Sequence, residues 1–311
     1  MSVAEAAPVI VSLSGRSSSS LWRDALRHLF HKRSAIVGMI ILGSLLFVAI
    51  FAPLLAPYDP NQVLIGIEKV KKRTPPCIHL LGCPADQPQH IMGVDGNVRD
   101  LFSRVLYGAR VSLFIGFSTV GFAIVIGTIL GAIAGYAGSW ADNIIMRLMD
   151  VLMAFPALLL AIAIVTVLGP GLNNALLAIG IVSIPHYARV MRASVLSIKE
   201  QDFVTADRAL GVSSERILFH RILPNALTPL IVRGTLGIAT AILDAAALSF
   251  LGLGAQPPMA EWGSMLGAER NQVFTAPHLV FFPGVAIMLT VLGFNLLGDG
   301  LRDALDPRLN R

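Results

Sequence analysis

Residues 35–56 read AIVGMIILGSLLFVAIFAPLLA and contain no charged side chain. An apolar run of about 20 residues is long enough to cross the hydrocarbon core of a bilayer as a helix. The run is too long, and it begins too far from the N-terminus, to be the apolar part of a cleaved signal peptide. It therefore predicts an uncleaved transmembrane helix.

The composition of all 311 residues points the same way. Hydrophobic residues make up 55% of the chain and charged residues 14%, and the mean hydropathy is +0.71. A soluble domain carries roughly 25% charged residues, and a chain this apolar could not cover its surface with polar groups. Intrinsic disorder is excluded as well, because it requires low hydrophobicity. The net charge of +5 fits Lys and Arg held on one side of a membrane, so we expect a lipid membrane as a partner and no nucleic acid.

Five more apolar runs follow, so the sequence predicts six spans with both termini on one side. The five runs cover residues 111–135, 148–168, 172–195, 226–251 and 278–298. Of the 24 Lys and Arg residues, 15 lie on the side of the termini: five before the first span, Arg147, six between 189 and 221, and three after the last span. Because cytoplasmic loops carry the positive excess, we expect a multi-pass protein of the cell inner membrane with both termini cytoplasmic. One basic cluster disagrees, but it lies in a long loop away from the helix ends, where the rule weakens; it consists of Lys69, Lys71, Lys72 and Arg73.

This topology divides the chain into five parts. We expect a cytoplasmic tail with an interfacial helix over 1–34, the first transmembrane helix over 35–56, an external loop over 57–108, a five-helix core over 109–301 and a cytoplasmic tail over 302–311. The interfacial helix is expected at residues 21–33, where apolar side chains share one helical face and basic residues flank it.

The external loop contains the only two cysteines of the sequence, Cys77 and Cys83. Six positions apart in an oxidising compartment, they could form a disulfide that closes a small loop, or they could be two free thiols. A zinc site is disfavoured, because only His79 and His90 are near and their spacing matches no familiar zinc pattern. We therefore predict no metal ligands.

Polar residues inside the predicted spans are the candidates for a substrate path. They are His186, Arg233, Asp244 and Asn295. An ionisable group inside a membrane is costly, so each either lines a watery path or bonds to a neighbouring helix. Arg233 and Asp244 are about 16 Å apart along one helix and cannot pair directly. One turn apart near the start of the third span, Arg147 and Asp150 are expected to form a local ion pair.

The second span has a face of small residues that predicts close helix packing rather than chemistry. Ala123, Gly127, Gly131 and Gly135 recur there at every fourth position.

Signatures of soluble enzymes are absent from the sequence. It has no G-x-x-x-x-G-K-[ST] phosphate-binding loop, no H-E-x-x-H and no G-x-S-x-G. We therefore expect no catalytic residue and no cofactor bound by this chain.

The segment between the fourth and fifth spans is polar and compact. Residues 199–224 read KEQDFVTADRALGVSSERILFHRILP and predict two short helices. Gly211 can adopt the left-handed turn that ends the first helix, and Ser213 can cap the second. Pro224 is expected to break the second helix before the fifth span. Such a helix pair suits a lever between a membrane domain and a soluble partner.

This segment resembles the EAA loop of bacterial ABC-importer permeases, whose pattern is E-A-A-x3-G-x9-I-x-L-P. Four residues are in register: Ala206, Gly211, Leu223 and Pro224. Three depart from the pattern: Thr205, Asp207 and Arg221. The resemblance implies contact with an ATPase through a set of residues in this loop. The set comprises Thr205, Ala206, Asp207, Ala209, Leu210, Gly211, Val212, Leu223 and Pro224.

The resemblance extends over nearly the whole chain from Trp22, and it is closest to the second permease subunit of dipeptide and oligopeptide importers. Residues 185–189 (PHYAR) and 248–258 (LSFLGLGAQPP) are among the matching stretches. The family usually has G-T-D-x-x-G-R-D where this chain reads GVDGNVRD, so Val98 replaces its second glycine. The resemblance implies an all-α, six-helix type I ABC-importer permease fold.

The partners follow from the same resemblance. It implies a heterodimer with a sister permease, two ATP-binding subunits that use ATP and Mg, and an extracytoplasmic substrate-binding protein. Di- and oligopeptides are the expected substrates, with glutathione, nickel chelates and oligosaccharides as alternatives. A rival class is an ion-coupled transporter with Asp244 and His186 as a proton relay, but the inverted repeat it requires is not convincing in this sequence. A membrane scaffold without an ATPase partner is a third alternative.

Overall fold

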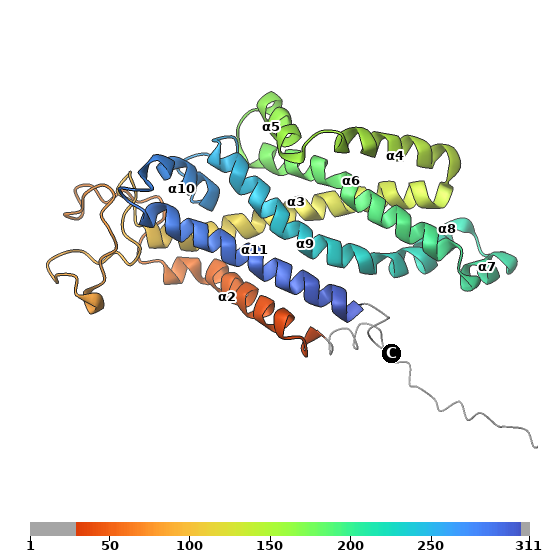
Figure 1. The fold of residues 1–311 in the computed structure, drawn as a ribbon, viewed down its shortest axis with the longest axis horizontal. Helices are drawn as coiled ribbons and strands as arrows, with labels where there is room; N and C mark the ends of the chain where they lie inside the picture. The colour runs from red at the N-terminus through yellow and green to blue at the C-terminus, as the bar shows by residue number, and fades with distance from the viewer. Residues whose placement is uncertain (1–28, 306–311) are drawn as a thin grey trace, which may run out of the picture.

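The computed structural model describes residues 29–305, which form a bundle of helices (Figure 1). Within these residues the backbone forms only isolated bridges and no strand, so the predicted all-α class is confirmed. The long helices run along the longest axis of the molecule. The loop after α2 (Arg33–Leu55) lies at one end, and the short helix α7 (Asp202–Ala209) lies at the other.

The most extensive helix contact joins α3 (Leu101–Ala137) and α6 (Leu172–Lys199). Any side chain at Gly127 or Gly131 of α3 would collide with the backbone of α6 at Ala188. The predicted small-residue face is therefore confirmed as a packing face, because it lets the two backbones approach closely.

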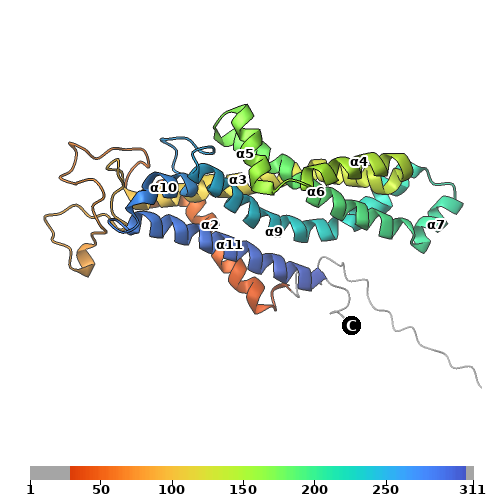
Figure 2. The same cartoon turned by 45° about the horizontal axis from the view of Figure 1, so that its top comes forward.

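A second group of helices completes the bundle. The helix α11 (His278–Leu305) packs against both α2 and α9 (Leu223–Phe250), and α9 also contacts α3 and α6. A Cβ at Gly38 of α2 would lie 2.8 Å from the backbone nitrogen of Leu297 in α11, so this contact is also backbone-close. In Figure 2, α4 (Ser139–Met153) lies along α6 on the face of the bundle away from α11.

The prediction of one helix over residues 148–168 is wrong. Two helices, α4 and α5 (Ala157–Leu168), meet there at 91°. Pro156 precedes the first residue of α5 and has no N–H to continue the hydrogen bonds of α4, so the first helix ends before it. Within the described residues, four helices are long and apolar enough to span a membrane, or five if this bent pair counts as one span. The predicted count of six is therefore not confirmed; α6 covers the fourth predicted span but carries several charges.

Two other boundaries differ from the predictions. The helix α3 begins at Leu101, ten residues before the predicted second span, and α11 continues to Leu305 beyond residue 298. Most of the interfacial helix expected at residues 21–33 lies outside the described residues.

Short helices occupy the two ends of the bundle. At the end with the loop are η1 (His79–Leu81), α10 (Trp262–Glu269) and η3 (Arg270–Gln272). At the other end, α7 is followed by α8 (Ser214–Ile217) and a five-residue π-helix, η2 (Leu218–Ile222), which runs directly into α9. We call residues 202–217 the α7–α8 hairpin.

Candidate functional site

The turn of the α7–α8 hairpin has the predicted conformation. Gly211 has φ +76°, its N–H donates to the Arg208 carbonyl (3.0 Å), and the N–H of Val212 donates to the Asp207 carbonyl (3.0 Å). These bonds satisfy the last carbonyls of α7 and end the helix. Ser213 stands at the N-cap of α8, but its side chain makes no capping bond, so that part of the prediction is wrong.

Pro224 does not break the second helix, contrary to the sequence prediction. It lies in the first turn of α9, which continues from the π-helix without interruption. A proline leaves a carbonyl one turn earlier without its N–H partner and crowds it, and a π-turn is a local way to absorb such a misfit within a helix. Nearby, the side-chain amide of Asn225 donates to the carbonyl of Arg221 (2.7 Å).

The hairpin turns most of its predicted coupling residues to the surface. Thr205, Ala206, Ala209, Leu210, Gly211 and Pro224 are exposed, whereas Asp207, Val212 and Leu223 are partly buried. Val204 and Ile217 are buried and anchor the two helices from within. Large apolar side chains are nevertheless exposed here, with Leu210 at 81% and Phe219 at 59%. Exposed apolar side chains at the end of a membrane domain are consistent with a surface that another protein covers.

Two departures from the family pattern contact each other. The Nε of Arg221 in the π-helix donates to Oδ2 of Asp207 in α7 at 2.8 Å. Sequence pattern alone does not pair these two residues. Their opposite charges were the available signal, but a separation of 14 positions across an undetermined turn hid the pairing.

The four candidate path residues do not form one cluster. His186 on α6 and Asp244 on α9 are partly buried, whereas Arg233 on α9 and Asn295 on α11 are exposed. Among the described residues, no hydrogen bond or ion pair joins any two of the four, and Asp244 has no polar partner.

The predicted ion pair between Arg147 and Asp150 is wrong. Asp150 of α4 instead pairs with Arg189 of α6 at 2.6 Å. Nearby, both terminal oxygens of Asp142 in α4 accept from Arg192 in α6. These bonds run between helices because α4 lies along α6, an arrangement that spacing within one helix cannot reveal.

The other end of the bundle holds a buried polar network. In the structure Cys77 and Cys83 form a disulfide, and a backbone bridge joins Cys77 to His90. The ring of His90, 1% exposed, lies 2.8 Å from Oδ1 of Asp100 and 3.1 Å from Oε2 of Glu68. Burial lowers the pKa of His90, but the hydrogen bond with Asp100 and the charges of both carboxylates outweigh it and raise the pKa above its usual value.

Tyr58 completes this network. Its hydroxyl donates to Oε1 of Glu68 (2.9 Å). Burial, helped by that hydrogen bond and the charge of Glu68, raises the pKa of Tyr58 to about 12.

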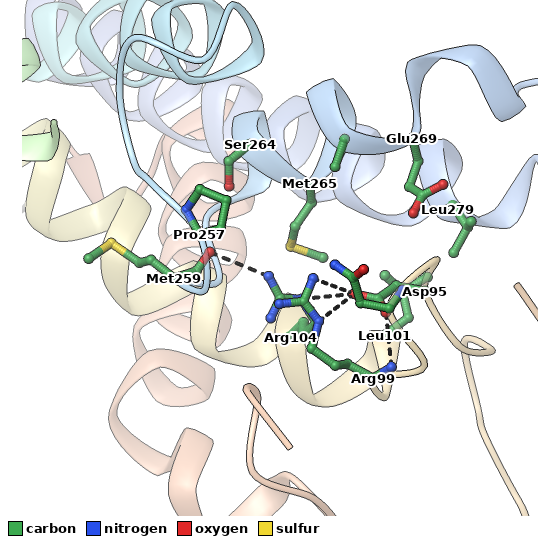
Figure 3. Close-up of a pocket in the computed structure, with 12 residues that line it drawn as sticks. Asp95, Arg99, Leu101, Arg104, Pro257, Met259, Ser264, Met265, Glu269 and Leu279 are labelled. Carbon is green, nitrogen blue, oxygen red and sulfur yellow. Dashed lines mark hydrogen bonds and ion pairs between the residues drawn. The ribbon is translucent and has the colours of Figure 1, made fainter. Parts of the chain in front are cut away.

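Arg104 connects the loop to the helices, as Figure 3 shows. Its guanidinium donates to the Pro60 carbonyl (2.7 Å) and lies 3.6 Å from the carboxylate of Asp95. Asp95 also pairs with Arg99 (2.7 Å). The pocket beside them measures about 70 Å³. This is the share of roughly two water molecules, so the pocket is too small for a peptide.

Val98 keeps the backbone that a glycine would favour. Its φ is +59°, in the left-handed region, although valine is β-branched. Its side chain is 2% exposed and packs against Leu64 and Val94. The loop therefore adopts here a backbone conformation that glycine would favour and fills the position with an apolar side chain.

In the described part of the chain, no three His, Cys, Asp or Glu side chains are grouped as metal ligands.

Comparison with known proteins gives consistent matches. A family model described as "Binding-protein-dependent transport system inner membrane component" matches residues 127–311, and "N-terminal TM domain of oligopeptide transport permease C" matches residues 20–76. The dipeptide transport system permease protein DppC of Alkalihalophilus pseudofirmus is 51% identical over 93% of this chain and 91% of its own length. The glutathione transport system permease protein GsiD of Pectobacterium atrosepticum is 43% identical over 97% of this chain and 95% of its own.

A solved structure shares the fold. An inward-facing MetNI methionine ABC transporter chain matches with a TM-score of 0.55 and 19% identity, covering 65% of this chain and 96% of that one. Together with the helix arrangement, this match identifies the type I ABC-importer permease fold.

Proposed function

The chain belongs to the family of binding-protein-dependent transport inner membrane components, and from this membership we propose that it is one of two permease subunits of an ATP-driven peptide importer. A sister permease would complete the membrane path. An extracytoplasmic binding protein would deliver dipeptides or short oligopeptides. Glutathione is the runner-up substrate, because a relative of similar coverage carries that name.

The exposed α7–α8 hairpin is the observation that carries this proposal. It presents Ala206, Gly211 and the 81%-exposed Leu210 on a projecting surface at one end of the bundle. We infer that two partner subunits, which bind ATP and Mg, dock on this surface and on its counterpart in the sister permease. This chain would hold no nucleotide and catalyse no reaction itself.

The chain's own role is mechanical. A partner that binds the hairpin more tightly in one conformation of the complex shifts the equilibrium between inward-open and outward-open states. Because the π-helix runs directly into α9, a displacement of the hairpin acts on α9, which contacts α3, α6 and α11.

Reconstitution tests the assignment. The chain, its sister permease and the two ATPases should be purified together and placed in proteoliposomes, with the binding protein outside. We expect uptake of labelled dipeptide that requires ATP and the binding protein. Uptake that persists without the ATPases, driven by a proton gradient, would overturn the proposal in favour of an ion-coupled transporter. Competition by unlabelled glutathione would separate the two substrate classes.

Thiol labelling tests the orientation. Ser213 in the hairpin and Gln256 at the other end are both exposed, and the two native cysteines are joined in a disulfide. We expect a cysteine at Gln256, but not one at Ser213, to react with an impermeant reagent in intact cells. Labelling of Ser213→Cys from outside would overturn the proposed topology.

Asp244 is the best candidate for the path itself. It is partly buried on α9, and no polar partner compensates its carboxylate in the described part of the chain. An isolated intramembrane carboxylate favours a wet path over a structural bond. We expect Asp244→Ala to lower uptake while the complex still assembles. Normal uptake would exclude a role in the path, and failed assembly would assign a structural one.

A further inference from the structure

We propose that the ion pair between Asp207 and Arg221 is a clamp that makes α7 and α9 move as one body, so that both residues position the coupling surface for the partner ATPase. This inference rests on the proposed function, and it adds a role for two residues that depart from the family pattern.

Few bonds hold α7 in place. Val204 is its one buried side chain, and backbone bonds join its ends to the adjoining turns. Within residues 29–305, the bond from Arg221 to Asp207 is the only side-chain hydrogen bond that joins α7 to another element. Without it, α7 would be held by the buried side chain of Val204, by its backbone bonds and by its chain connections.

Asp207 and Arg221 pair with each other although other charged side chains lie on the same segments. Several charged side chains lie on the hairpin and the π-helix: Asp202, Asp207, Arg208, Glu215, Arg216 and Arg221. Of these, only Asp207 and Arg221 form an ion pair. The side chain of Asp207 is 13% exposed, whereas that of Arg221 is 57% exposed. A carboxylate held mostly away from water needs its partner more than a solvated surface charge does.

Arg221 lies in the π-helix that leads into Pro224 and α9. A π-turn accommodates one residue more than an α-turn, so it sets the direction in which Arg221 leaves the helix. The clamp therefore joins α7 to the π-helix, which is continuous with α9.

The ion pair is expected to affect coupling more than the free energy of folding. An ion pair with one well-exposed partner contributes little to folding stability. A pair retained in this position therefore serves to orient α7 rather than to hold the protein folded. Loss of the pair should lower the efficiency of coupling more than it lowers the amount of folded protein.

Charge reversal tests the clamp in the reconstituted complex. We expect Asp207→Arg and Arg221→Asp each to lower the peptide taken up per ATP hydrolysed by about tenfold, with normal amounts of assembled complex. The double variant, which restores a pair of opposite charges, should recover uptake per ATP to within about twofold of the unaltered complex. Arg302→Asp is the matched control, since it makes the same charge change at an exposed position on α11, outside the hairpin, that forms no ion pair in the described residues; it should couple normally.

Two results would overturn the clamp. One is normal coupling in both single variants. The other is a double variant no better than the singles, because each residue would then act alone, for example by touching the ATPase.

Hydrogen exchange on the isolated chain in nanodiscs separates the clamp from the proposed function. The amides of α7 should exchange faster in each single variant and return to the original rate in the double variant. Unchanged exchange in the singles would overturn the clamp even if the complex transports peptides. Restored exchange in the double variant, in a protein that never transports peptide with any ATPase, would overturn the proposed function and leave the clamp standing.

Discussion

The two ends of the bundle are held together by different interactions. At the loop end, the charges of Asp95, Arg99 and Arg104 are buried together, and a disulfide closes the neighbouring segment. On the hairpin, one ion pair with an exposed arginine joins α7 to the π-helix. The loop end is therefore held by buried charges and a covalent link and the hairpin by one ion pair, while apolar side chains are exposed at both ends, among them Leu80 (94%) and Leu210 (81%).

This difference indicates how each end should respond to substitution. Breaking a buried ion pair costs folding stability, whereas a pair with an exposed partner contributes little to it, so the loop end is expected to respond through stability. The exposed apolar side chains of the hairpin gain hydrophobic stabilisation when another protein covers them, so the hairpin end is expected to respond through binding.

The largest expected effect is at the hairpin end. Ala206 is exposed, so Ala206→Glu meets nothing in this chain but should clash with a docked ATPase and abolish ATP-driven uptake. Gly211→Val should do the same, because φ +76° costs a β-branched residue about 1–2 kcal/mol. Uptake in proteoliposomes, normalised to the amount of complex, measures both.

Gly82→Val is the control at the loop end. Gly82 has φ +96° and, like Gly211, open space around it, so the backbone cost is the same. This variant should transport normally. Near-normal uptake by both hairpin variants would contradict the assignment of that surface.

The next effect in size is expected at the loop end. Asp95→Asn removes the carboxylate that faces Arg99 and Arg104, whose side chains are 11% and 4% exposed. Breaking a buried pair by removing one partner costs about 3–5 kcal/mol. Denaturant unfolding in detergent should show this loss. Asp207→Asn at the hairpin end should cost less than about 1 kcal/mol, and equal losses would remove the contrast between the ends.

A smaller, pH-dependent effect is expected at His90. Its pKa is raised in the folded protein by Asp100 and Glu68, so protonated His90 stabilises the loop. That contribution is fully present below the unfolded pKa of about 6.5, and it is lost as the pH rises through the elevated folded pKa. The protection of the amides of residues 57–100, measured as their exchange rate relative to the unfolded rate at the same pH, should therefore fall over that interval. His90→Gln should remove this pH dependence of protection. His220→Gln, at an exposed position of the hairpin end, should leave it intact.

The smallest effect is expected for Val98→Gly. The substitution relieves the left-handed backbone, worth about 1–2 kcal/mol, but it removes a buried side chain worth about 1.5–3 kcal/mol. The net change in the free energy of unfolding should be within about 1 kcal/mol. Val94→Gly is the comparison, since Val94 is fully buried without a positive φ and should lose more. Equal losses would show that the backbone at Val98 is not strained.

Local patterns in the sequence predicted what local physics decides. The apolar run at 35–56 became α2, the small-residue face of α3 packs on α6, and Gly211 adopts its turn. Each depends on side chains close together in the chain. These features carried the fold class and the surface of the candidate site.

Features that depend on how helices are placed could not be predicted. Asp150 pairs with Arg189 of α6, not with Arg147 on its own helix, because α4 lies along α6. Asp207 met Arg221 only because the turn and the π-helix bring them together. The continuity through Pro224 also depended on the π-helix, which apolar periodicity does not reveal.

The π-helix at Leu218–Ile222 makes the length of this connection a functional quantity. A π-turn corresponds to one residue inserted into an α-helix, and each residue of an α-helix rotates the chain by about 100°. Because the π-turn absorbs that residue, deleting one residue there would restore an unbroken α-helix and leave the hairpin facing the same way. Inserting a further residue that no bulge absorbs would instead rotate the hairpin about the α9 axis by roughly a quarter turn. Substitutions in this segment change its chemistry one side chain at a time, whereas such an insertion would turn the whole docking surface.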